Sequence, residues 1–273
     1  MAVRADLHIH TTASDGTWTP AELIIKAKKC GLGLIAVTDH DSVANVAEAG
    51  RLAAQENIKF LPGAEICSTK ENLSFHILGY GIDIANKVLL ELMRHNEALL
   101  EQKDVDSIRL LARDGWAVDE AEFARYTYDR RRGGWRALAY LIDKGLCTGV
   151  GDFFSRIFTP EHDLGFPTFP AIEEVIAVIH GAGGVALCAH AASGFHGPGL
   201  EKVMDMLRTE KLDGFECYHS NHSEEGTQRL LRHCQKHQLL ISGGSDCHGS
   251  FVPSRHLGEP YVDTKMLNLG DLI

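Results

Sequence analysis

The feature that most constrains this chain is the alternation of short apolar runs with amphipathic stretches of helical periodicity. Seven runs have the length of strands, at residues 5–10, 34–38, 58–67, 73–79, 184–190, 212–218 and 239–244. Helical patterns separate most of them, at residues 20–30, 42–56, 87–114, 171–181, 200–209 and 223–237. Strands that alternate with helices usually form a parallel sheet, because the helix serves as the crossover connection. The pattern therefore predicts an α/β protein with a parallel sheet or barrel.

The stretch from about residue 87 to 169 interrupts this rhythm. It reads as helices and loops, and it holds the basic cluster Arg130, Arg131 and Arg132. We interpret it as an inserted helical cap and not as an independent domain. Residues 1–273 would then form a single barrel domain, close to the roughly 200–250 residues over which α/β barrels run as one unit.

Residue types that bind metals gather at the ends of the apolar runs. His8 and His10 are two apart, so on a strand both side chains would point to the same face. The other runs contribute His40, Glu65, His76, His190, Asp246 and His248, and the first loop contributes Asp15. Parallel barrels build their active sites at the carboxyl ends of the strands. Because neutral imidazole binds transition metals well, we expect a metal site at this end of the barrel.

These residues lie in motifs that resemble those of the PHP (polymerase and histidinol phosphatase) family. In chain order the motifs are HxH at 8–10, SDG at 14–16, TDHD at 38–41, GAE at 63–65, FHILGYG at 75–81, AH at 189–190 and SDCHG at 245–249. The resemblance covers about residues 1–82 and 184–249. It implies a distorted (β/α)7, TIM-like barrel, which agrees with the seven runs counted independently.

The resemblance also implies a trinuclear metal centre. The implied ligand sets are His8, His10, Glu65 and Asp246 for one ion, Glu65, His76 and His190 for a second, and Asp15, His40 and His248 for the third. Asp15 stands where some family members have His. An additional carboxylate favours harder ions, so we expect Mn²⁺, with Zn²⁺ and Fe²⁺ as alternatives.

A centre of this kind suits the hydrolysis of phosphate esters, since neighbouring metal ions polarise a phosphoryl oxygen and acidify a shared water. We therefore predict a phosphoesterase that attacks a small phosphorylated metabolite (a nucleotide, sugar phosphate or cyclic phosphate) with a metal-bridging hydroxide. Asp246 and His222 are the catalytic candidates, His222 as the general acid for the leaving oxygen. Small-molecule phosphatases of the family often carry an E-x-Y…S-x-H segment. Residues 216–222 match it, which makes Tyr218 and His222 candidates for substrate binding.

The cap offers further substrate-binding candidates. Arg131 and Arg132 could clamp a second phosphate or a carboxylate, because guanidinium groups pair with both. Similar phosphoesterases of the family carry a segment of the type G-R-P-H-x-A-R-A-L. Residues 130–138 read RRRGGWRAL, so Arg131 and Arg136 align while the Pro and His are absent. Arg255, in the loop after the last ligand, is another candidate. A run of three arginines is equally typical of a solvated face.

Two other activities fit the same motifs: a 3′–5′ exonuclease or oligonucleotide-end nuclease, and histidinol phosphatase. A net charge of −10 without a long basic track argues against binding of duplex nucleic acid. The chain has no signal-peptide pattern at its start and no run of about 20 apolar residues, so we expect a cytoplasmic protein that does not contact membranes. Seven cysteines without a Cys-x-x-Cys spacing argue against a disulfide framework. The oligomeric state stays open.

Overall fold

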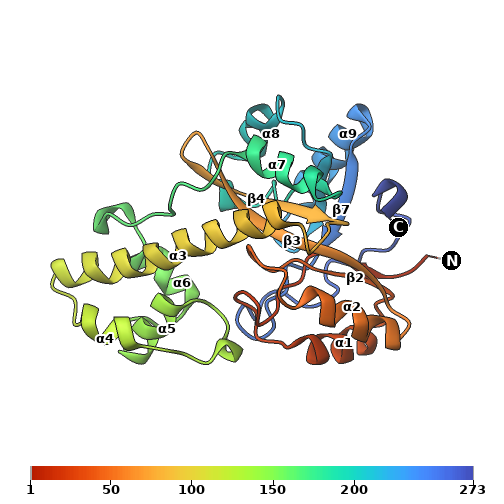
Figure 1. Ribbon diagram of the computed structural model, residues 1–273. Coiled ribbons are helices and arrows are strands. Elements are labelled where there is room, and N and C mark those ends of the chain that lie inside the picture. Colours follow the sequence, from red (N-terminus) through yellow and green to blue (C-terminus); the bar gives the residue numbers. More distant parts are fainter. Residues whose placement is uncertain (1, 273) are drawn as a thin grey trace.

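Seven strands in chain order form a nearly closed barrel in the computed structural model, which describes residues 2–272 (Figure 1). The strands are β1 (Ala5–Asp6), β2 (Leu34–Val37), β3 (Lys59–Lys70), β4 (Leu73–Tyr80), β5 (Val185–Cys188), β6 (Gly214–His219) and β7 (Leu240–Gly244). Backbone hydrogen bonds join the segment that follows β1 to β7 and to the loop after β7. The Leu7 N–H donates to the Gly243 carbonyl (3.2 Å) and the His10 N–H to the Cys247 carbonyl (2.9 Å). The fold is the distorted TIM-like barrel that the sequence predicts.

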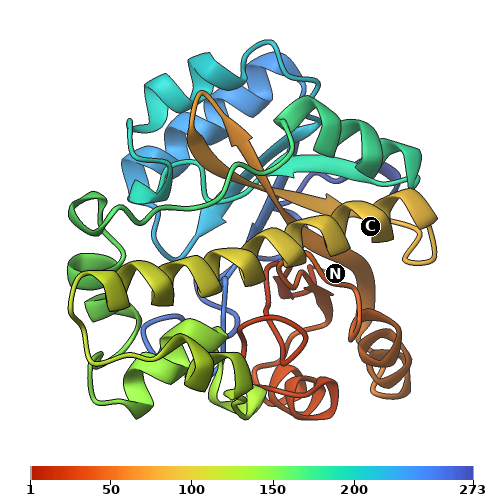
Figure 2. The ribbon, with the colours of Figure 1, turned by 60° about the vertical axis from the view of Figure 1, so that its left-hand side comes forward.

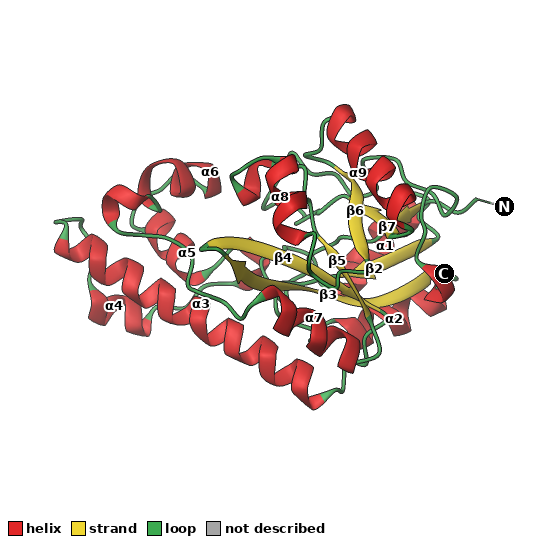
Figure 3. Cartoon of the chain, turned by 90° about the horizontal axis from the view of Figure 1, so that it is seen from above, coloured by secondary structure: helices red, strands yellow, loops and turns green. Residues whose placement is uncertain are grey.

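β4 is antiparallel to both of its neighbours, which corrects the expectation of a parallel sheet at this point. β3 and β4 form a long hairpin (Figure 3) whose two turn residues, Glu71 and Asn72, have φ angles of 50° and 65°. Positive φ at both positions is typical of the tight turns that join antiparallel strands. So short a connection cannot contain a parallel crossover. Because β4 is reversed, His76 near its start lies at the same end of the barrel as the carboxyl ends of the parallel strands.

Helices pack around the barrel and build the cap. They are α1 (Pro20–Lys29), α2 (Val46–Gln55), α3 (Lys87–Arg113), α4 (Glu120–Arg125), α5 (Arg136–Asp143), α6 (Val150–Asp152), α7 (Ile172–Gly181), α8 (Leu200–Leu207) and α9 (Glu224–His237). Short helical turns are η1 (Arg130–Arg132), η2 (Phe153–Ile157), η3 (Pro160–His162), η4 (Gly194–His196) and η5 (Gly270–Leu272). No helix within residues 2–272 is both long enough and apolar enough to cross a membrane.

α1 illustrates how the local sequence sets these elements. Thr19 caps the helix and forms a reciprocal capping box with Glu22, and Pro20 occupies the first turn. Both features favour a helix start, because they satisfy or remove backbone N–H groups that have no partner inside the helix. Leu23 and Ala27, four residues apart, are fully buried against the barrel.

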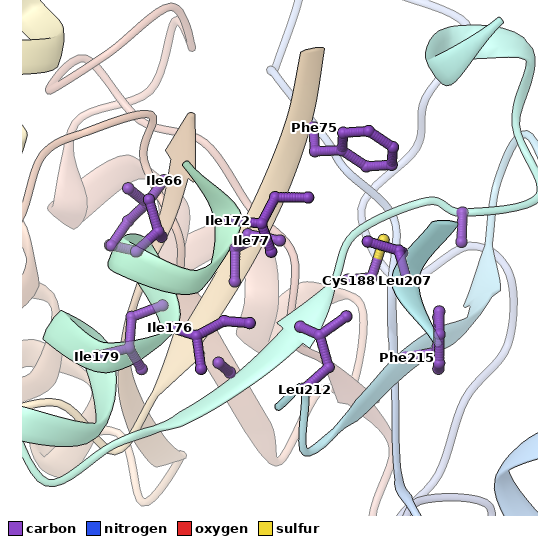
Figure 4. Packing of buried hydrophobic residues seen from close by; sticks show 14 of the residues in the cluster. Ile66, Phe75, Ile77, Ile172, Ile176, Ile179, Cys188, Leu207, Leu212 and Phe215 are labelled. Carbon is purple, nitrogen blue, oxygen red and sulfur yellow. The ribbon is translucent and has the colours of Figure 1, made fainter. Parts of the chain in front are cut away.

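A hydrophobic cluster between the sheet and α7 holds the barrel together (Figure 4). Ile66 of β3 and Ile77 of β4 are fully buried there, together with Ile176 and Ile179 of α7. Burying one side chain of this size is worth about 1.5–3 kcal/mol. This packing fixes the strands that carry Glu65 and His76, because each residue lies next to a buried isoleucine.

α3 connects the barrel to the cap (Figures 1 and 2). Leu89 and Leu92, in its first half, belong to the cluster that includes α7, whereas Ile108 and Leu111 belong to a separate cluster with α4, α5 and η2. The cap proposed for residues 87–169 therefore shares its first helix with the barrel, and its own hydrophobic core begins near Val105.

Candidate metal centre

The nine predicted ligand residues come together at the carboxyl end of the barrel. His8 and His10 follow β1, Asp15 lies in the next loop, His40 follows β2, Glu65 and His76 lie in β3 and β4, His190 follows β5, and Asp246 and His248 follow β7. Their possible ligand atoms form three groups, each with all atoms within 4.8 Å of one another: His8, His10, Glu65 and Asp246; Glu65, His76 and His190; and His10, Asp15, His40 and His248. The groups match the sets drawn from the resemblance, with His10 added to the third.

Glu65 is fully buried at the centre of the cluster. Its Oε2 atom faces three imidazole nitrogens: Nε2 of His8 at 3.1 Å, Nε2 of His10 at 3.2 Å and Nδ1 of His40 at 3.2 Å. Its Oε1 atom faces two more, Nδ1 of His76 and Nε2 of His190, both at 3.0 Å. One carboxylate whose two oxygens face different sets of histidines has the form of a bridge between two cations.

The hydrogen bonding of the cluster supports its fitness for metal ions. The buried atoms Glu65 Oε2, His8 Nε2, His10 Nε2 and His40 Nδ1 have no hydrogen-bond partner, although they face one another. A buried polar atom without a partner costs about 1–3 kcal/mol. Cations in the first and third ligand groups would satisfy all four, because imidazole nitrogens and carboxylate oxygens are the ligands that divalent transition metals accept.

Two further carboxylates complete the cluster. Asp246 Oδ1 lies 3.1 Å from Nε2 of His10, and Asp246 Oδ2 lies 3.1 Å from Nε2 of His219 and contacts the guanidinium of Arg255. Asp15 Oδ2 lies 3.2 Å from Nε2 of His248. Each carboxylate therefore faces a different part of the histidine cluster.

Burial and neighbouring charges divide the histidines into two kinds. Burial disfavours the charged form of His10, but the carboxylates of Asp246 and Glu65, which lie 3.1 and 3.2 Å from its Nε2, outweigh burial and raise its pKa to about 10. Burial lowers the pKa of His40 and of His190 to about 3, and nearby Glu65 does not compensate. The histidines around Glu65 hold the pKa of its carboxyl well below the usual range despite its burial. At neutral pH the cluster thus contains carboxylates and the neutral imidazoles of His40 and His190, the forms that bind metals, whereas His10 must lose a proton before it can bind one.

Glu216 of β6 is a functional residue that the sequence analysis used only as part of a motif. Its Oε1 accepts the Nδ1–H of His8 at 2.9 Å, and its Oε2 accepts the backbone N–H of His190 at 2.7 Å. The first contact keeps a proton on Nδ1 of His8, so Nε2, which faces Glu65, is the nitrogen that can lose its proton and bind a metal ion. The second helps to hold His190, whose φ of 31° is unusual for a residue other than glycine. A buried acid inside an apolar run was the signal that could have identified it.

His222 and Tyr218, predicted for catalysis and substrate binding, contact backbone groups and the hydrophobic core in the structure. Both ring nitrogens of His222 are bonded to backbone: Nδ1 donates to the Cys217 carbonyl (3.1 Å) and Nε2 accepts from Ala192 N–H (3.1 Å). Burial also lowers the pKa of His222, which does not favour a general acid. Tyr218 packs against the hydrophobic clusters and against Gly243. Neither residue lines the cavity in front of the ligand cluster.

The cap arginines occupy different positions from those expected. Arg131 is exposed and pairs with Glu22 (2.6 Å), and Arg132 forms a two-pronged pair with Asp143 on the cap surface (2.9 and 2.7 Å). Both contacts agree with the alternative interpretation of the three arginines, a solvent-exposed basic surface. Their neighbours Arg130 and Arg136 line the cavity instead, and so does Arg255.

That cavity, of about 830 Å³, lies between the barrel end and the cap. One wall carries ligand candidates that include His40, Glu65, His76, His190, Asp246 and His248. The lining also contains an aromatic wall, formed by Trp135, Phe153, Phe154, Phe158, Phe166, Phe195 and Phe251. The ring of Phe195 packs 4.5 Å from that of His76, and the ring of Phe166 lies 6.2 Å from that of Phe195. The aromatic wall therefore begins at the ligand cluster. Phe154, Phe166 and Phe195 are each at least 40% exposed, which is typical of side chains that meet a ligand.

Comparison with known proteins agrees with this geometry. Residues 6–179 match the family model of the PHP domain. The chain belongs to the PHP domain family. A solved structure from Bifidobacterium adolescentis, described as a metal-dependent phosphoesterase, is 30% identical with a TM-score of 0.82, and the match covers 96% of this chain and 93% of that one. An amidohydrolase from Chromobacterium violaceum, solved with bound sulfate, is 28% identical with a TM-score of 0.76 over 91% of this chain and 89% of its own.

Relatives of known activity place this PHP protein among the phosphoesterases. The 3′,5′-nucleoside bisphosphate phosphatase of Chromobacterium violaceum is 30% identical over 93% of this chain and 90% of its own. A 5′-3′ exoribonuclease of Haemophilus influenzae is 29% identical over 91% of each chain. A phosphoribosyl 1,2-cyclic phosphate 1,2-diphosphodiesterase of Eggerthella lenta is 25% identical over 93% of this chain and 97% of its own. The chain is therefore a metal-dependent phosphoesterase, and its family implies divalent metal ions.

Proposed function

We propose that this PHP protein hydrolyses a phosphate ester of a nucleotide at a centre of three divalent ions. The observation that carries the proposal is the cavity between barrel and cap, which is lined both by the ligand cluster and by aromatic rings. Its volume of about 830 Å³ lies in the range of small-molecule sites, roughly 300–1,000 Å³. A nucleotide presents to such a cavity both an anionic end and a flat apolar end.

The three ligand groups described above would hold the ions, and Glu65 would be shared between two of them. Mn²⁺ is the ion we favour over Zn²⁺ or Fe²⁺, because the set contains three carboxylates. When bound, the ions polarise a phosphoryl oxygen of the substrate and lower the pKa of a water molecule.

The chain's own side chains would orient the substrate around this centre. Arg255, which contacts Asp246 and lines the cavity, would bind an oxygen of the phosphate that is cleaved. Arg130 and Arg136, on the cap side, would contact a second anionic group. Stacking of a base on an aromatic ring is worth about 1–3 kcal/mol, and Phe166 and Phe195 present exposed rings next to the cluster.

The phosphorylated end of a short oligoribonucleotide is the second candidate substrate. Two relatives, from Haemophilus influenzae and Escherichia coli, are 5′-3′ exoribonucleases, and each is 29% identical over at least 90% of this chain. Their polarity is opposite to that of the 3′–5′ nuclease considered from the sequence. The same cavity would then take the terminal nucleotide of the strand.

Phosphate release from a matched panel of substrates tests the proposal. Mn²⁺-loaded protein would receive a nucleoside 3′,5′-bisphosphate, a nucleoside monophosphate, ribose 5-phosphate, a cyclic ribose phosphate, histidinol phosphate and a short 5′-phosphorylated oligoribonucleotide. We expect KM for the nucleotide to be at least about tenfold lower than for ribose 5-phosphate, which has the same phosphate but no base; that factor corresponds to roughly 1.4 kcal/mol of stacking. Equal KM values would show that the aromatic wall does not bind a base. His40→Ala is the control, and it should abolish release from every substrate.

A further inference from the structure

Gly133 and Gly134, in the cap, stand directly against two loops that carry ligand candidates of the third group. The Gly134 N–H donates to the backbone carbonyl of Asp15 at 2.9 Å. Both glycines have a φ of +73°, a conformation that other residues rarely adopt.

The space around the glycines is filled by the barrel. A Cβ atom added to Gly133 would lie 2.5 Å from Cβ of Phe251 and 2.8 Å from the carbonyl oxygen of Asp15. A Cβ on Gly134 would lie 2.9 Å from the ring of Phe251. These distances are shorter than van der Waals contact, and one of the obstacles is backbone. Any side chain at Gly133 must therefore displace the Asp15 loop or the Phe251 segment.

Phe251 extends the contact to another ligand candidate. It follows His248 by three residues, and its N–H donates to the His248 carbonyl at 3.4 Å. Its ring lies 6.1 Å from that of Trp135 in the cap and 6.3 Å from that of His248. The glycine pair thus touches the segments of Asp15 and His248, whereas His10 and His40 are held by the barrel strands.

Neighbouring contacts hold the glycine segment in place from the cap side. The Tyr128 hydroxyl donates to the Gly134 carbonyl at 2.8 Å, and Arg130 Nη1 donates to the Ala13 carbonyl at 3.2 Å. The Asp15 loop has no regular secondary structure of its own. Its position therefore depends on contacts from both sides: Asp39 in the barrel, which accepts the Ser14 hydroxyl at 2.6 Å, and Gly134 in the cap.

We propose that Gly133 and Gly134 are positioning residues for the third metal ion: the docked cap holds Asp15 and His248 in the arrangement that binds it. The inference rests on the three-ion centre of the proposed function. The first two ligand groups contain neither Asp15 nor His248. A variant that disturbs the glycine contact should therefore bind the third ion more weakly and still bind the other two.

Mn²⁺ binding by metal-depleted full-length protein, measured by equilibrium dialysis, tests this inference. We expect Gly133→Ala to bind two ions as the unchanged protein does and to bind the third at least about tenfold more weakly, the size of effect seen when groups that orient metal ligands are removed. Gly145→Ala is the matched control. Gly145 is also in the cap with a positive φ (+70°), but a Cβ there would meet nothing within 4 Å, so the clash is absent. Gly133 also has a ψ of 178°, a conformation essentially restricted to glycine, so Phe251→Ala, which changes no glycine, separates the loss of the contact from backbone strain.

Two further variants keep the outcomes distinct. Phe251→Ala removes the ring but keeps both glycines, so it should weaken binding of the third ion less than Gly133→Ala does. If Gly133→Ala does not fold, Phe251→Ala provides the test. Asp15→Ala should bind only two ions. Unchanged binding of the third ion by Gly133→Ala and Phe251→Ala, with its loss in Asp15→Ala, would overturn the positioning role alone. Fewer than three ions in the unchanged protein, or three in Asp15→Ala, would instead overturn the proposed centre and the inference with it.

Discussion

Glu216 offers the sharpest test of the metal centre, because it touches two ligand groups and no substrate. Each of its oxygens accepts one hydrogen bond, from the His8 ring (2.9 Å) and from the His190 N–H (2.7 Å). Glutamine has the same shape but only one accepting oxygen. In Glu216→Gln, either the amide NH₂ faces the His190 N–H, donor against donor, or it faces Nδ1 of His8.

The second orientation moves the proton of His8 to Nε2, the nitrogen that would bind the metal. Groups that hydrogen-bond the second ring nitrogen of a metal-binding histidine typically contribute 10–100-fold to metal affinity, or about 1.4–2.8 kcal/mol. A lost hydrogen bond to a charged group is worth about 1.5–3 kcal/mol, so two independent arguments give the same range. We therefore expect Glu216→Gln to lower the affinity for the ion held by His8, or for the ion held by His190, about 10–100-fold.

Titration calorimetry with Mn²⁺ on metal-depleted protein measures this effect. Glu56→Gln is the matched control, since it makes the same chemical change in an exposed pair with Lys28. Circular dichroism of the metal-depleted variants would verify that both are folded. Identical Mn²⁺ affinities for Glu216→Gln and the unchanged protein would refute the claim that Glu216 fixes the His8 tautomer.

Two further predictions follow from the electrostatics of the site. Nearby carboxylates raise the pKa of His8 well above its usual value, and that of His10 to about 10, against the effect of burial. Both rings are therefore protonated at pH 7 in the metal-free protein, and each must lose a proton to bind a metal ion. Mn²⁺ addition at pH 7 should release about two protons per chain, detectable in weakly buffered solution, and affinity should rise as pH rises towards 10; no release would contradict these pKa shifts. Arg132→Ala should leave KM unchanged and cost at most about 1 kcal/mol of unfolding free energy, because its pair with Asp143 is exposed. Arg136→Ala should instead raise KM about tenfold or more, if one charged hydrogen bond from Arg136 binds the substrate. Equal KM values for both variants would show that Arg136 does not bind the substrate.

The sequence predicted the features that depend on local patterns. The seven strands follow from runs of apolar residues, and the ligand residues could be identified because they lie at the ends of those runs or in motifs. The direction of β4 depends on the turn at Glu71 and Asn72, whose conformation is not evident from residue type alone. The joining of cap and barrel by α3 was equally hidden, because the helix is continuous across both hydrophobic cores.

The substrate side of the site was less predictable because it depends on packing. Arg130, Arg131 and Arg132 are alike in sequence, and only the 3-10 turn η1 directs the first toward the cavity and the other two toward carboxylates on the surface. His222 looked available because its motif contains a histidine, but the chain folds so that backbone groups take both of its nitrogens. The aromatic wall escaped notice because its rings come from distant segments.

The closure of the barrel between β1 and β7 has a consequence for how the protein is made. Glu65, His76 and His190 lie in the middle of the chain, so their group is fully synthesised before β6 and β7 leave the ribosome. The other two groups pair residues near the start of the chain with Asp246 and His248 near its end. During translation, a chain that folds from its N-terminus can therefore complete one ion-binding group early, while the remaining two must wait for the last strand to arrive.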